Sequence, residues 1–115
     1  MSAPETPGEI ITREVSGWPD VATSGDRSGV LRFSVGRRQL GHVHGDWAAH
    51  FPLPRRLREQ LMAEGRVERH PAARAAGSGW AARRIRSEED VGDVIDLFRL
   101  QYERAREARS RQYER

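Results

Sequence analysis

Residues 30–51, VLRFSVGRRQLGHVHGDWAAHF, decide the fold, because they contain three segments of strand character joined by two short turns. In "VLRFSVG" apolar and polar residues alternate, which is typical of a strand with one buried face. "GRR" turns the chain and "QLGHVH" forms the next strand. Gly45-Asp46 is a strong hairpin signal, after which "WAAHF" runs back. The stretch therefore predicts an antiparallel meander.

Helical signals lie on both sides of this meander. In residues 6–18, Thr6 and Glu9 have the spacing of a capping box, and Pro7 suits the first helical position. A second helix begins at or just after Pro54, with Gly65 as a natural C-terminal cap. A third begins at residues 87–90 and is marked by an apolar seam at helical spacing: Val91, Val94, Ile95, Phe98 and Tyr102. Three helices are therefore expected.

These elements predict an α+β fold in which a small antiparallel sheet of about five strands packs with three helices. The expected order is α-β-β-β-β-α-β-α, with a short extended piece at 21–23 and the last strand at 80–86. Residues 66–79 read as irregular, with a brief strand at their start. We expect a flexible N-terminus at 1–7, a single domain at 8–104 and a charged helical extension at 105–115.

The C-terminal extension repeats a short motif, "LQYER" at 100–104 and "RQYER" at 111–115. Eleven residues are close to three helical turns, so Tyr102 and Tyr113 are expected on one face of a helix. Two interpretations stay open: a solvated tail, or a helix that packs on a partner subunit to form a homodimer.

Composition excludes several classes of protein. The 115 residues contain no cysteine, so neither a disulfide framework nor a thiolate zinc site is available. The N-terminal residues lack the basic and apolar regions of a secretion signal, and no stretch reaches the roughly 18 apolar residues of a membrane span. We therefore expect a soluble cytoplasmic protein without membrane association.

Positive charge is concentrated in the middle of the chain. All 20 basic residues are arginines, and residues 31–86 hold twelve of them against four acids, a net charge of +8 in a chain of net charge +3. Such a region can attract a nucleic acid or another anionic partner. Aromatic residues are sparse around Arg37, Arg38, Arg55 and Arg56, which counts against a single-strand-binding surface. A non-enzymatic module that binds nucleic acid or protein is therefore the alternative, and nucleic acid is not the favoured partner.

Three of the four histidines lie within the meander. His42 and His44 share a face of their strand, at a spacing that brings two imidazoles to one metal ion or one small ligand. A two-residue loop after His44 sends His50 to the opposite face, whereas one more loop residue places His50 opposite His42. The fourth, His70, follows the second helix. Ordinary structural histidines are the simplest alternative.

A metal site is a further alternative. "GRRQLGHVH" fits the opening of the cupin motif, but the expected glutamate does not follow. Three or all four of the histidines could still coordinate one metal ion through their imidazoles. We predict a site without a cofactor and without a metal, and keep the metal as the open alternative.

Several segments together carry a resemblance: "GRRQLGHVHGD", "FPLPRRLREQLMAEGRVERHP", "GSGW" and "RIRSEEDVGDVIDLFRLQYER". They resemble bacterial luciferase-domain proteins, a largely uncharacterised family that is similar to the domain of fungal luciferases. The resemblance covers roughly residues 8–104. The C-terminal part is also similar to the end of the YjbR-like double-wing proteins, which implies a fold of that general kind.

The resemblance implies oxygenation of a hydroxypyrone by O2 without flavin, and it places His42, His44, His50 and His70 on the histidines of the fungal pattern. The segment between His44 and His50 is one residue shorter here, which leaves the place of His50 open.

A model of the site follows from this resemblance as a hypothesis. His42 or His44 deprotonates an enol or phenol, while His70 and Arg69 stabilise the anion. The predicted ligand-binding residues are His50, Asp46, Trp47, Arg69 and Trp80, the tryptophans forming an apolar wall. Asp46 and Glu68 are candidates for orienting an imidazole. The expected partner is a small hydroxylated aromatic or pyrone.

Overall fold

The computed structural model describes residues 3–70 and 79–113, with side chains to residue 112. Its helices are α1 (Pro7–Ser16), α2 (Arg55–Ala63) and α3 (Glu88–Tyr113). Its strands are β1 (Val21–Gly25), β2 (Val30–Val35), β3 (Arg38–His44), β4 (Ala48–Pro52), β5 (Glu68–Arg69) and β6 (Trp80–Arg84). Most of the predicted irregular segment, residues 71–78, lies outside the described residues.

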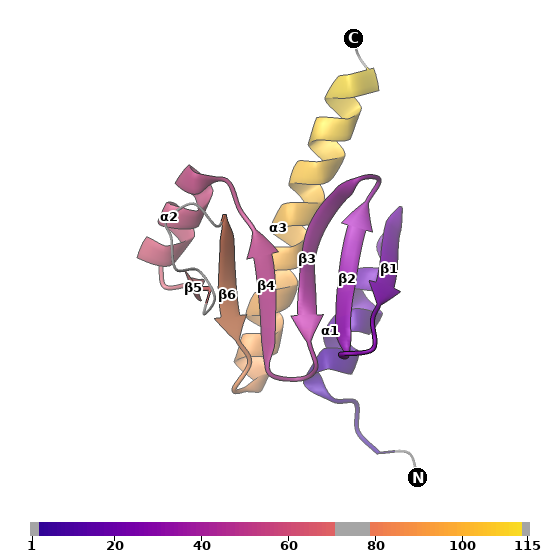
Figure 1. Cartoon of the computed structure of the whole chain (residues 1–115), viewed down its shortest axis with the longest axis vertical. Helices are drawn as coiled ribbons and strands as arrows, with labels where there is room; N and C mark the ends of the chain where they lie inside the picture. Colours follow the sequence, from indigo (N-terminus) through magenta and orange to yellow (C-terminus); the bar gives the residue numbers. More distant parts are fainter. Residues whose placement is uncertain (1–2, 71–78, 114–115) are drawn as a thin grey trace.

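The strands form one antiparallel sheet in the order β1-β2-β3-β4-β6-β5. Helices α1 and α3 lie together behind the sheet, and α2 lies beyond its β5–β6 edge (Figure 1). The predicted α+β fold and its element order are confirmed. The described part of the sheet has one strand more than the five expected, because the brief strand foreseen near residue 66 forms as β5 on the edge.

Helix α1 begins where its capping box predicts. The Thr6 hydroxyl accepts a hydrogen bond from the Glu9 amide, and the Glu9 carboxylate accepts one from the Thr6 amide. These bonds satisfy two of the backbone donors that a helix leaves unpaired at its start. Ile11 and Val15, one turn apart, are both 0% exposed against the sheet. The cap and the apolar face therefore fix this helix together.

Helix α2 follows Pro54 directly and is terminated by Gly65, as predicted. Its C-terminal cap is Glu64, and Gly65 is the next residue, with φ of +72°. The Arg66 amide donates to the Leu61 carbonyl across this turn. Glycine takes the left-handed conformation just after the helix, where a Cβ is disfavoured.

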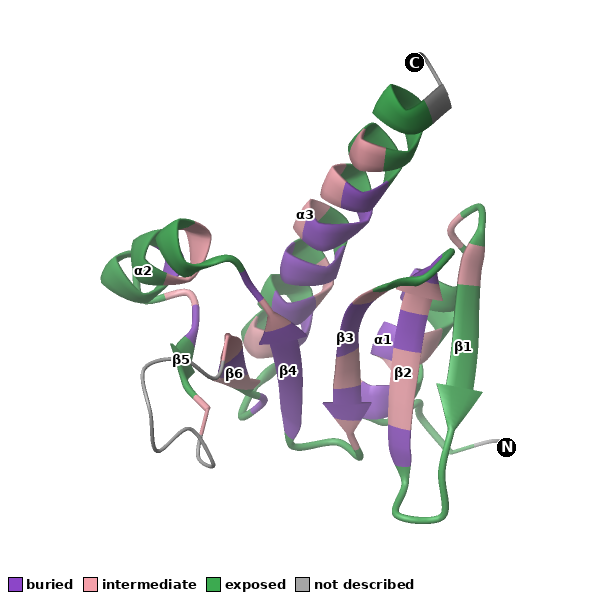
Figure 2. Cartoon of the chain, turned by 45° about the horizontal axis from the view of Figure 1, so that its top comes forward, coloured by how far each residue is buried: buried purple, intermediate pink, exposed green. Residues whose placement is uncertain are grey.

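Helix α3 runs unbroken through the predicted boundary at residue 104. Ala105, beyond that boundary, is only 3% exposed, so the first part of the predicted extension packs with the domain. The buried face of α3 is purple along most of its length in Figure 2. Of the predicted seam, Ile95 is half-buried rather than buried, and Leu97 is buried in addition. The side chain of Tyr113 lies outside the described residues.

The core is centred on Phe98 of α3, whose ring contacts those of Phe33 and Phe51 at centroid distances of 5.2 and 4.7 Å. Gly41 lies beneath this cluster. A Cβ built there would be 2.7 Å from the His50 carbonyl oxygen and 3.0 Å from the Phe98 ring. Only glycine lets helix and sheet approach this closely.

Two irregularities of β3 position the side chains discussed below. Phe33 pairs with Gly41 and Ser34 with Gln39, so Leu40 is an extra residue in a β-bulge. The β3–β4 turn has three residues, since His44 pairs with Ala48, and Gly45 opens it with φ of +53°.

In the described residues no helix has both the length and the apolar character that a bilayer crossing needs.

Candidate functional site

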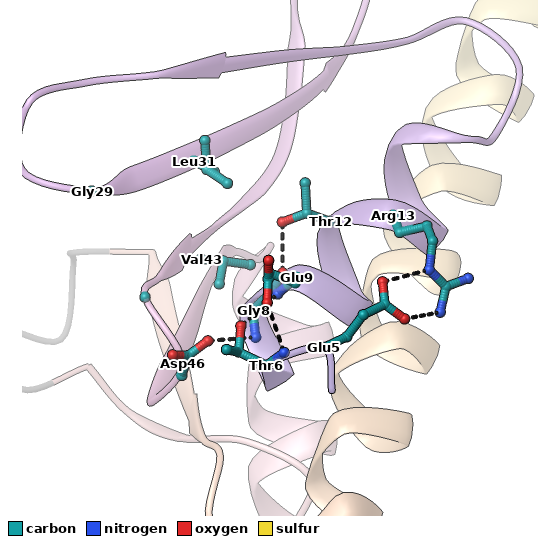
Figure 3. A pocket seen from close by; sticks show the side chains of 11 residues that line it. Glu5, Thr6, Gly8, Glu9, Thr12, Arg13, Gly29, Leu31, Val43 and Asp46 are labelled. Atoms are coloured by element: carbon teal, nitrogen blue, oxygen red, sulfur yellow. Dashed lines mark hydrogen bonds and ion pairs between the residues drawn. The ribbon is translucent and has the colours of Figure 1, made fainter. Parts of the chain in front are cut away.

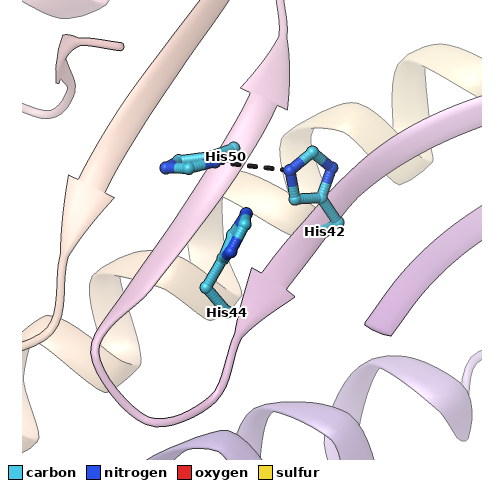
Figure 4. A group of neighbouring side chains, drawn as sticks. All are labelled: His42, His44 and His50. Atoms are coloured by element: carbon cyan, nitrogen blue, oxygen red, sulfur yellow. Dashed lines mark hydrogen bonds between the residues drawn. The ribbon is translucent and has the colours of Figure 1, made fainter. Parts of the chain in front are cut away.

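The three histidines of the meander meet on one face of the sheet. Trp47 belongs to the turn, so His42 pairs directly with His50, and His44 lies two residues along the same strand. Of the two turn lengths that the sequence leaves open, the longer one forms. We call this side of the sheet, opposite α1 and α3, the histidine face; Figure 4 shows the rings of His42, His44 and His50 converging there.

The imidazoles are in direct contact. His50 Nδ1 is 3.3 Å from His42 Nε2 and 3.2 Å from His70 Nε2. The ring of His44 has its centroid 4.4 Å from that of His50 and 4.9 Å from that of His42. Two distant parts of the chain, the meander and the segment after β5, therefore supply one cluster of four imidazoles.

Gln39 is a member of this site that the sequence analysis missed. Its Oε1 lies 3.1 Å from His42 Nδ1, so this nitrogen donates its hydrogen to the amide oxygen and Nε2 keeps a lone pair. Residues three apart on a regular strand point to opposite faces. The bulge at Leu40 returns Gln39 to the face of His42, and no regular period reveals this.

The surroundings keep these imidazoles neutral. Burial lowers the pKa of His50 to about 3 and that of His42 to about 4, and it lowers the pKa of His44 as well. Neighbouring imidazoles and, for His42 and His44, the Arg32 guanidinium add repulsion toward a proton. At neutral pH each of these three rings therefore has one unprotonated nitrogen, and that of His42 is in contact with His50 Nδ1.

Two ring nitrogens have no partner. Nε2 of His44 and Nε2 of His50 are buried and make no hydrogen bond within the described part of the chain. One nitrogen from each of His42, His44 and His50 lies within 4.8 Å of the others. Such a set can accept a proton from a ligand, donate hydrogen bonds to an anion, or coordinate a metal ion.

Both predicted tryptophans lie beside the cluster. Trp80, the first residue of β6, has its ring centroid 4.9 Å from that of His42. Trp47, in the β3–β4 turn, is 5.6 Å from His44 and is 61% exposed. Trp47 is therefore the exposed ring of the pair, and Trp80 is half-buried.

Of the remaining predicted residues, Asp46 and Arg69 start away from the histidine face, whereas Glu68 shares a row with His50. Asp46 accepts a hydrogen bond from the Gly8 amide at 2.9 Å, which ties the turn to the start of α1 and gives this carboxylate a structural partner. Arg69 pairs with Ala81, in the row of buried Phe51, so its side chain starts from the face opposite His50. Exposed Glu68 is in the row of Ala82 and His50.

The arginines of the alternative interaction surface do not gather in one place. Arg37 and Arg38 are exposed around the β2–β3 turn, whereas Arg55 and Arg56 are exposed on α2. Arg55 pairs with Glu59 of its own helix at 3.1 Å. Binding to nucleic acid or protein stays a prediction.

A hollow of about 470 Å³ lies away from the histidines, between the start of α1 and strands β2 and β3 (Figure 3). Its acidic side chains are engaged within the chain: Glu5 pairs with Arg13 and Glu9 closes the capping box. It contains no histidine. The histidine face, which has unpartnered ring nitrogens, is therefore the candidate site, and this hollow is not.

A comparison with protein families identifies the chain. The family described as Luciferase domain matches residues 37–101, which is more than half of the sequence. The chain belongs to the luciferase-domain family. No curated protein and no solved structure matches it. The matched luciferase domain includes all four histidines and Gln39, and it begins at the β2–β3 turn and ends in α3.

Proposed function

We propose that this luciferase-domain protein binds a planar hydroxylated aromatic or pyrone on its histidine face and oxygenates it with O2. One observation supports this above all: His42, His44, His50 and His70 converge between two tryptophans in a chain of this family. Membership alone does not establish an activity, so the proposal rests on the chemistry of these side chains.

The first step is proton transfer from the ligand. An acidic enol or phenol hydroxyl gives its proton to the neutral imidazole of His42 or His44, and attraction between the imidazolium and the new oxyanion offsets the burial that otherwise disfavours the charged ring. The imidazolium N–H that results and the neighbouring ring of His70 would then stabilise the oxyanion. Unlike water, these rings are already in place before the charge develops.

The second step is addition of O2. The ligand anion supplies two electrons from its electron-rich ring carbon, and a new carbon–oxygen bond forms to O2. The distal oxygen then takes back the proton from the imidazolium, which gives a hydroperoxide and restores the neutral cluster. The atoms and electrons of this reaction balance with the ligand and O2 alone, so neither flavin nor nicotinamide is needed.

The tryptophans favour a flat ligand. Stacking on Trp80 would hold a ring beside His42, because the two side-chain rings are already in contact. Trp47, largely exposed in its free state, gains burial when a ligand covers it. A planar hydroxylated ring therefore suits both the apolar and the polar parts of the surface.

The test is a thermal-shift screen of planar phenols and hydroxypyrones, followed by O2 uptake with each compound that binds. We expect His42→Ala and His44→Ala to fold, to lose the shift and to lose O2 uptake. Arg109→Ala, a change of an exposed residue near the far end of α3, is the control and should behave as wild type. If both histidine variants bind every compound as wild type does, the proposal is wrong.

A further inference from the structure

We propose that His42, His44 and His50 bind one divalent first-row transition-metal ion through their imidazole nitrogens. The three side chains come from two paired strands, and their nitrogens lie within 4.8 Å of one another. A tetrahedral ion with metal–nitrogen bonds of about 2.0–2.1 Å needs nitrogens about 3.3 Å apart, so modest side-chain rotations suffice.

The unpartnered nitrogens point to a missing ligand. His50 is only 5% exposed, and its Nε2 has no hydrogen-bond partner among the described residues; the same holds for Nε2 of His44. Leaving a buried acceptor unsatisfied is unfavourable, and native proteins rarely do so twice within one cluster. A metal ion satisfies both nitrogens at once, which no single hydrogen-bond donor from the described residues does.

Gln39 supplies the support that metal-binding histidines usually have. Such a histidine donates its other ring N–H to an oxygen acceptor, which fixes the tautomer and the ring orientation. His42 Nδ1 makes this contact with Gln39 Oε1 at 3.1 Å, so Nε2 is unprotonated and would exchange its contact with His50 Nδ1 for the ion. The bulge at Leu40 brings Gln39 to this position.

The donor set indicates the class of metal. Three neutral imidazoles favour borderline ions such as Zn²⁺, Fe²⁺, Co²⁺, Ni²⁺ or Cu²⁺ over Mg²⁺ and Ca²⁺, which prefer oxygen. With three protein ligands, at least one coordination position stays open for water or a ligand. The geometry thus favours the metal alternative over the cofactor-free site that the sequence predicts.

The metal site extends the proposed function but does not depend on it. In a metal-loaded protein the ion, rather than the free imidazoles of His42 and His44, would hold the ligand oxyanion, and His70 stays outside the three-ligand set. Metal binding is measured without any organic ligand, so it succeeds or fails separately from the proposed oxygenation.

The experiment titrates Co²⁺ into chelator-treated full-length protein, followed by visible absorption and by calorimetry. We expect one equivalent to bind with micromolar or tighter affinity. Gln39→Leu should weaken binding about 10–100-fold, as loss of an outer-shell partner does, and Gln39→Glu, which restores an acceptor, should recover it. His44→Ala, in which a ligand is lost, should weaken binding further.

Circular dichroism checks that each variant is folded, and Glu59→Gln, a change of an exposed carboxylate on α2, controls for loose surface binding. Zn²⁺ should displace Co²⁺ from the wild type. Absence of saturable one-to-one binding, or His44→Ala binding as tightly as the wild type, overturns the inference. If folded Gln39→Leu protein binds Co²⁺ as tightly as the wild type, the inference that Gln39 supports a metal-binding His42 is wrong.

Discussion

Gln101 joins α3 to the two histidine-bearing strands, and its replacement by leucine should destabilise the protein strongly. The side chain is 5% exposed. Its Nε2 donates to the Leu40 carbonyl at 3.2 Å and to the Pro52 carbonyl at 2.7 Å. Leu40 is the bulged residue and has no cross-strand partner, so Gln101 provides a partner that the sheet ladder does not.

The size of the effect follows mainly from these two bonds, and the variant also loses a third, in which Gln101 Oε1 accepts from the Arg104 guanidinium. Each hydrogen bond contributes about 0.5–1.5 kcal/mol net, and a buried carbonyl left unsatisfied costs about 1–3 kcal/mol. Leucine has nearly the same volume as glutamine, and burial of its apolar side chain offsets part of the lost free energy. We expect Gln101→Leu to lower the free energy of unfolding by about 2–4 kcal/mol, which corresponds to a Tm decrease of roughly 8–17 °C in a domain of this size.

The assay is urea unfolding of wild type and variant, followed by tryptophan fluorescence and far-UV circular dichroism. Glu103→Gln is the matched control, since Glu103 is on the same helix but pairs with Arg99 at the surface, and it should change stability by less than about 0.5 kcal/mol. A Gln101→Leu protein within about 1 kcal/mol of wild type would show that the two carbonyls do not depend on this amide.

Two other predictions concern the core and the acid stability of the fold. Gly41→Ala places a methyl group 2.7 Å from the His50 carbonyl oxygen, so it should cost at least about 1–3 kcal/mol in thermal unfolding; full stability would mean that helix and sheet separate easily. The Arg86 amide and the Arg83 guanidinium hold the pKa of Asp90 below its usual range. This carboxylate therefore stabilises the fold above about pH 4, and its contribution is lost as the pH falls through the lowered pKa. The stability difference between wild type and Asp90→Asn should shrink between pH 5 and pH 3, measured by urea unfolding, and a difference independent of pH would contradict this.

Local signals in the sequence were sufficient for the helices and for most of the sheet. The capping box at Thr6 depends on contacts within one helical turn, and the apolar seam that includes Phe98 depends on one helix face. Both patterns can be read from the spacing of residues in a single sequence. The point where α3 stops packing on the domain is less visible in the sequence, because an amphipathic helix gives no signal there, and burial continues past the boundary expected at residue 104. Ala105 is buried by the tertiary structure, and its own sequence does not show this.

The site was only partly predictable. The pairing of His42 with His50 depended on one residue of turn length, and the sequence left both lengths open. The sequence does not reveal Gln39, because the bulge at Leu40 breaks the period of two, and it does not show from which face Arg69 starts, because its strand has only two residues. Short strands and bulges are set by tertiary pairing, so local periodicity does not determine them.

The β3 strand presents His42 to one side of the sheet while its neighbour Gly41 touches Phe98 on the other. A sheet is a single layer, so α3 packs against the same strands that carry the imidazoles. The positions of these strands, and with them the spacing of the imidazoles, depend on how α3 packs. Substitutions on the buried face of α3, at Phe98 above all, should therefore change the spacing of the ring nitrogens without touching any histidine. Enlarging or trimming a side chain there shifts the strands, and the ring nitrogens move with them.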